Sequence, residues 1–188
     1  MGIALFTRYL LPVEHGLSVI TQSTKDFIRR AAEMGADGIF YAIQHARPRL
    51  LAREEFLRFS RASDLDLLDA ASGMWCNMLH LHGDDVYFGA VADYPAHIIN
   101  WHDREAGPTL SEARNTWRGA MCGGLSRTTL VFGDRNRVRQ EALEALAQTD
   151  GRRLLVSTGC VAPIITPYGN LMAARQSVEV HPTKKRII

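Results

Sequence analysis

The fold is decided by Asn77-Met78-Leu79-His80-Leu81-His82-Gly83-Asp84-Asp85, a stretch that closes an apolar run beginning at Met74. Such a run, ended by polar residues and a glycine, predicts a buried strand. His80 and His82 are two positions apart, so in a strand both side chains point to the same face, about 6–7 Å apart along the backbone. Neutral imidazoles can share a metal ion, although hydrogen-bonded pocket or surface histidines show the same spacing.

Composition restricts the class of protein. The chain has 188 residues, of which 46% are hydrophobic and 22% charged, as in one soluble globular domain spanning 1–188. The net charge is +2, and basic and acidic residues are both spread along the chain. This pattern does not indicate a surface that binds nucleic acid. The basic tail at 181–186 is short enough to be a solvated end.

Location is predicted from the cysteines and the first residues. The three cysteines (Cys76, Cys122 and Cys160) are few for a chain of this length, which favours a reducing compartment. The apolar run at 3–13 is interrupted by Arg8 and Pro12, is too short to span a bilayer and lacks a cleavage-site pattern. We therefore expect a cytoplasmic protein with no membrane partner.

Strand-like and helix-like segments alternate along the chain. Short apolar runs predict strands at 38–43, 74–81, 97–101, 119–122 and 154–156. Helical spacing and capping signals predict helices at 16–34, 51–71, 84–92, 109–115, 134–148 and 167–180. In helix 134–148, we expect Val138, Leu143 and Leu146 to face the core. Because the strands are continuously apolar, the pattern favours a parallel sheet covered by helices.

Each predicted strand ends in groups capable of chemistry. In chain order these are Gln44-His45, His80-Leu81-His82, Trp101-His102-Asp103-Arg104, Cys122-Gly123-Gly124 and Ser157-Thr158-Gly159-Cys160. Loops after strands are commonly polar, but histidine, cysteine and tryptophan are not ordinary loop residues. Because ligands bind at the carboxyl ends of parallel strands, we predict a site on this rim.

With these residues placed, the chain resembles the uroporphyrinogen decarboxylase superfamily, whose members are (β/α)8 barrels. The matching segments follow the family order and are Glu33-Met34-Gly35-Ala36-Asp37-Gly38-Ile39, Leu79-His80-Leu81-His82-Gly83, 119–124, Gly159-Cys160-Val161-Ala162-Pro163, Thr166-Pro167 and Asn170-Leu171. The resemblance implies a partial TIM barrel of about five parallel strands with outer helices, because a whole barrel needs about 250 residues. A second copy, a longer chain or the first segment would cover its open edges, and we favour self-association.

The resemblance implies two activities. The decarboxylase branch removes carboxylates from a tetrapyrrole without metal, using an arginine-rich segment, a central aspartate and a late histidine that have no counterpart here. The methyltransferase branch passes a methyl group from a corrinoid to a thiol, and holds zinc with a His-x-Cys pair and a later cysteine. His80 and Cys160 match the first and third of these ligands, while His82 replaces the middle cysteine.

With His82 in place of the middle cysteine, the three residues still offer a set of ligands that zinc can bind. Two nitrogens and one thiolate leave a fourth tetrahedral position open, where a small-molecule thiol substrate would lose its proton. An imidazole in place of a thiolate makes the site less electron-rich, so a different substrate or metal is an alternative. A corrinoid protein is a candidate partner, and a non-catalytic partial barrel is the third hypothesis.

Other rim residues are assigned roles around this site. His102 and Asp103 are the catalytic candidates, orienting substrate or acting as acid and base, with a capped turn as the alternative. Four residues are candidates for substrate binding, although Cys122 also suits plain apolar packing: Gln44, His45, Trp101 and Cys122. Asp84 and Asp85 either hold an imidazole tautomer or begin a helix.

Overall fold

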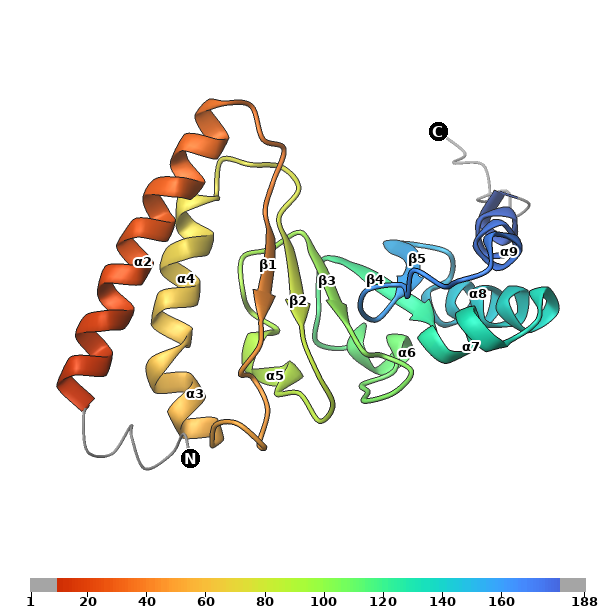
Figure 1. Ribbon diagram of the computed structural model, residues 1–188, viewed down its shortest axis with the longest axis horizontal. Helices are drawn as coiled ribbons and strands as arrows, with labels where there is room; N and C mark the ends of the chain where they lie inside the picture. Colours follow the sequence, from red (N-terminus) through yellow and green to blue (C-terminus); the bar gives the residue numbers. More distant parts are fainter. Residues whose placement is uncertain (1–9, 180–188) are drawn as a thin grey trace. The chain divides into compact units, whose positions relative to one another are not determined.

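A computed structural model describes residues 10–179, so the basic tail at 181–186 and most of the run at 3–13 lie outside the described residues. Helices and strands alternate in the order α2 (Leu10–Glu33), β1 (Phe40–Ile43), α3 (Arg53–Phe59), α4 (Arg61–Ala70), β2 (Met78–Leu81), α5 (Phe88–Val91), β3 (Ile98–Trp101), α6 (Leu110–Ala113), β4 (Ala120–Leu125), α7 (Arg127–Phe132), α8 (Arg135–Thr149), β5 (Leu154–Thr158) and α9 (Tyr168–Glu179) (Figure 1).

The strands form one sheet in which they follow one another in chain order. β1 and β2 pair in parallel, with Ala42 opposite His80. β4 and β5 also pair in parallel, with Leu125 opposite Thr158. The predicted α/β class, with parallel strands and helices, is therefore confirmed.

The chain divides after residue 98 into two compact units. Units of this kind occur within one domain as well as between domains, so the single domain over 1–188 stays a prediction. Among the described residues, no helix has both the length and the apolar character needed to cross a membrane.

In the first unit, α2 and α4 lie side by side (Figure 1). The core between the helices and the strands contains Ile28, Leu67, Ala71 and Met74. Asn77 fixes the start of β2, since its amide donates to the Ala71 carbonyl (2.8 Å) and accepts from the Ile39 N–H (3.1 Å). This pairing sets the register that places His80 on the sheet.

A buried polar cluster ties the same unit together. The Asp64 carboxylate of α4 accepts hydrogen bonds from the Tyr41 hydroxyl (2.6 Å) and the Tyr94 hydroxyl (2.9 Å). Burial raises the pKa of Asp64 above its ordinary value, and the two hydroxyl donors oppose that rise. The cluster therefore links β1, α4 and the segment before β3.

In the second unit, α7, α8 and α9 pack on β4 and β5. Their shared core contains Leu125, Leu130, Val138, Ala142, Ala173 and Ala174. Short α6 begins with the predicted capping box, because the Thr109 hydroxyl accepts from the Glu112 N–H and the Glu112 carboxylate accepts from the Thr109 N–H.

Several local features differ from the predictions. The helix at 51–71 is two helices that meet at Ser60, whose φ of −101° departs from the helical value. The strand at 74–81 begins only at Met78, after a turn. α7 was missed because six residues are too few to show a period. Leu143 is 43% exposed, so it does not face the core.

Gly16, inside α2, gives a prediction about stability. A Cβ added there meets nothing within 4 Å, so Gly16→Ala should raise the free energy of unfolding by about 0.5–1 kcal/mol, because alanine loses less backbone entropy in a helix. Gly35, where α2 ends at φ +90°, is the control, since Gly35→Ala should be destabilising. Urea unfolding measures both, and a loss of stability in Gly16→Ala would contradict the expectation.

Candidate metal centre

Two histidines of the first unit lie in β2 or directly after it. His80 lies within the strand and is only 4% exposed, and His82 follows the strand directly. The His82 N–H donates to the Ile43 carbonyl (3.1 Å), which continues the pairing with β1 one residue beyond β2. The ring centroids of the two imidazoles are 5.7 Å apart. The period-2 argument thus correctly placed both rings on one face of the sheet.

In the second unit, Cys160 follows β5 in a tight loop. The Thr158 hydroxyl donates to the Cys160 carbonyl. A Cβ added at Gly159 would lie 2.4 Å from the Trp101 carbonyl oxygen and 2.6 Å from the His102 Cα. Because only glycine fits against this backbone, the residue before Cys160 lies in direct contact with the end of β3 and with His102.

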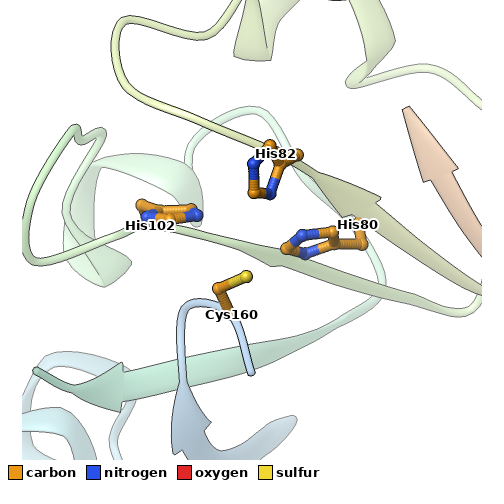
Figure 2. A group of neighbouring side chains, drawn as sticks. All are labelled: His80, His82, His102 and Cys160. Carbon is orange, nitrogen blue, oxygen red and sulfur yellow. The ribbon is translucent and has the colours of Figure 1, made fainter. Parts of the chain in front are cut away.

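Four side chains then gather their ligand atoms, as Figure 2 shows. One nitrogen from each of His80, His82 and His102 and the Cys160 sulfur all lie within 4.8 Å of one another. The three residues predicted to bind metal are thus brought together, and His102, predicted to be catalytic, lies with them. The sequence had already placed His102 after β3, but it gave no signal that its ring would join the other three.

The loop that carries His102 is fixed by its neighbours. The Asp103 carboxylate accepts from the Gly124 N–H (3.0 Å), and burial raises the pKa of Asp103 to about 6. Arg104 donates through Nε to the Gly124 carbonyl (2.6 Å) and through Nη2 to the Glu141 carbonyl (2.9 Å). Asp103 and Arg104 therefore anchor this loop to β4 and α8, while a catalytic role of Asp103 stays a prediction.

The predicted substrate-binding residues divide into two groups. Gln44 and His45 follow β1 and are exposed, and their part in substrate binding stays a prediction. Trp101 is fully buried and its indole N–H donates to the Pro108 carbonyl (2.8 Å), so it packs in the core, and its part in substrate binding stays a prediction. Cys122 is buried inside β4, which runs on to Leu125, and burial raises the pKa of its thiol.

Asp84 does not act on the imidazoles through the contacts described. Its exposed carboxylate pairs with Arg47 (3.3 Å) and Arg49 (3.5 Å). α5 begins only at Phe88, so neither suggested role for Asp84, a tautomer-holding partner or a helix start, is observed. Sequence analysis missed these arginines, because Arg47 and Arg49 follow β1 without any motif.

Parallel strands in chain order and outer helices define an α/β protein, and a group of three histidines and one cysteine has the donor atoms of a metal site. The family model described as "Uroporphyrinogen decarboxylase (URO-D)" matches residues 5–181, so the chain belongs to this family.

A solved structure of a methyltransferase from Methanosarcina mazei has the same fold, with a TM-score of 0.81 and 22% sequence identity. The match covers 95% of this chain and 52% of that one, so the chain spans about half the length of the structure it resembles. A search of curated proteins finds no match.

Proposed function

We propose that the chain assists methyl transfer from a corrinoid to a thiol, with zinc bound by His80, His82 and Cys160. The observation that carries the proposal is the gathering of these ligand atoms, with His102, within 4.8 Å. Atoms around a tetrahedral zinc ion lie roughly 3.3–3.8 Å apart, given bond lengths of about 2.0–2.3 Å. Small side-chain rotations would therefore suffice, and imidazole and thiolate are the ligands that zinc prefers.

The donor set suits a catalytic site better than a closed structural one. With His80, His82 and Cys160 as its ligands, zinc would keep one position for a substrate thiol and would supply Lewis-acid chemistry that lowers the thiol pKa. The His102 imidazole, which lies among the ligands, would accept the thiol proton at a ring nitrogen. Methyl transfer would form the bond between the thiolate sulfur and the methyl carbon and break the bond from that carbon to the corrinoid cobalt, and the electron pair of the broken bond would stay with the corrinoid.

Metal analysis of single variants tests this proposal. Purified protein should contain about one zinc per chain, which His80→Ala and Cys160→Ala should lose because each removes a ligand. His102→Ala should retain zinc but lose methyl transfer from methylcobalamin to a thiol. Cys122→Ala, a buried thiol within β4, is the matched control and should keep both. Folded wild-type protein without zinc, or zinc retained in Cys160→Ala, would overturn the proposal.

The name of the family supports a second candidate, decarboxylation of a tetrapyrrole. This activity predicts tight binding of an anionic porphyrinogen by metal-free protein, which equilibrium dialysis would detect.

The third candidate is a non-catalytic partial barrel, and it predicts a folded, inactive monomer. Self-association stays our prediction. Sedimentation velocity of the full chain distinguishes a self-associated protein from a monomer.

A further inference from the structure

Phe40 lies on the same face of the sheet as His80. In the parallel pairing of β1 with β2, Phe40 is opposite Met78 and Ala42 is opposite His80. Residues opposite each other in a parallel pair point to the same side, and residues two apart in a strand do so as well. Consequently Phe40, Ala42 and His80 share one face.

The rings of Phe40 and His80 are stacked. Their centroids are 5.5 Å apart and their planes are inclined by only 24°. An offset stack of this kind is an attractive arrangement for two flat rings, and it restricts rotation of the imidazole about its side-chain bonds. Phe40 therefore helps to determine which way the His80 nitrogens point.

The two stacked residues differ greatly in exposure. His80 is 4% exposed, whereas Phe40 is 63% exposed, so most of the Phe40 side chain remains open to a ligand. The neighbours on its face, Ala42 and Gln44, are also exposed, and alanine leaves space beside the ring. A single exposed phenylalanine means little by itself. One that stacks on a metal-ligand candidate adjoins the place where a substrate would bind.

We infer that Phe40 is a positioning and specificity residue, which orients His80 and packs its open side against a flat apolar group of the substrate. The inference rests on the proposed function. It narrows the substrate class to thiols that carry an aromatic ring or a comparable flat group. Such a group gains both burial and stacking on Phe40, which an ethyl group cannot match.

Ligand selectivity of the cobalt(II)-loaded protein tests the inference. Phenylmethanethiol and ethanethiol are titrated separately, and the visible bands of cobalt report their binding without any turnover. Wild-type protein should prefer the aromatic thiol by roughly three- to tenfold, the size of one aromatic contact. Phe40→Ala should remove the preference, and Phe40→Leu should keep only part of it. An unchanged ratio of affinities in Phe40→Ala would overturn the inference.

Controls separate this inference from the proposal beneath it. Phe132 on α7 is another exposed phenylalanine, and Phe132→Ala should leave the ratio unchanged. Cobalt binding is titrated first in every variant. A wild-type protein that binds no cobalt would overturn the proposed function and the role of Phe40 with it. A wild-type protein that binds cobalt but shows no preference for the aromatic thiol would overturn the role of Phe40 alone.

Discussion

Gly159→Ala is expected to weaken zinc binding by at least about tenfold and to lower the free energy of unfolding by roughly 2–4 kcal/mol. A Cβ at this position would lie 2.4 Å from the Trp101 carbonyl oxygen and 2.6 Å from the His102 Cα. Both atoms belong to the backbone, so neither can turn away as a side chain would. The loop after β5 must therefore move, and Cys160 moves with it.

Zinc affinity should fall by more than the loss of stability alone would cause, because Cys160, a proposed zinc ligand, is itself displaced. A thiolate moved by one ångström loses most of its bond to zinc, since coordination distances vary by only about 0.2 Å. Zinc affinity of the folded variant, measured by competition with a chelator, separates this displacement from simple unfolding. Circular dichroism of the same samples establishes the folded fraction.

Gly169→Ala is the matched control in the same unit. A Cβ at Gly169 would lie 2.7 Å from the Arg135 Nε, which is almost as close. That contact involves the end of an exposed, flexible side chain, which can rotate away at little cost. We expect zinc affinity to stay within about twofold of wild type and stability to change by less than about 0.5 kcal/mol. Equal losses in both variants would refute the argument from backbone contact.

Local periodicity predicted the parts of the site that one strand determines. The alternation of side chains in a strand was sufficient to put His80 and His82 on one face, and the apolar run gave their strand. The helix predicted to end at residue 34 ends at Glu33, and Gly35 follows with a φ of +90°, a conformation that glycine adopts at helix ends. These features depend on residues only a few positions apart.

Contacts between distant segments were beyond local patterns. A strand was predicted at 119–122, yet Gly123 and Gly124 continue β4 to Leu125, although glycine weakens strands. A Cβ at Gly123 would lie 2.6 Å from the Asp103 carboxylate, and one at Gly124 would lie 2.4 Å from the Ala145 Cβ. Contacts with residues distant in the sequence therefore leave no room for a side chain at either glycine, and no local pattern reveals these contacts.

The same limit explains the two residues whose surroundings were misjudged. Trp101 ends an apolar strand at the rim, which made it a candidate for substrate binding, but its side chain is buried and a carbonyl seven residues later accepts its indole N–H. His102 was assigned to acid–base chemistry on position alone. Its ligand atom lies among those of three residues from other segments, and the close approach of Gly159 to the His102 backbone joins two loops far apart in the sequence.

Glu141→Ala should lower the free energy of unfolding by about 3 kcal/mol, because its carboxylate is buried and serves several donors at once. Its side chain is 3% exposed and accepts from the Ser126 N–H (2.9 Å) and the Thr129 hydroxyl (2.7 Å) at the start of α7. The Arg104 Nε lies 3.9 Å from the same carboxylate. Removing Glu141 leaves two donors and part of a guanidinium charge without compensation.

Glu144 makes a decisive comparison on the same helix. Its carboxylate approaches the Arg104 Nη1 more closely, at 3.1 Å, but its side chain is 41% exposed. Water replaces an exposed ion pair well, so Glu144→Ala should cost less than about 1 kcal/mol. If distance governed the energetics, Glu144→Ala would be the more damaging change. Urea unfolding of the two variants under identical conditions decides between burial and distance, and with it whether the loop bearing His102 is anchored mainly through Glu141.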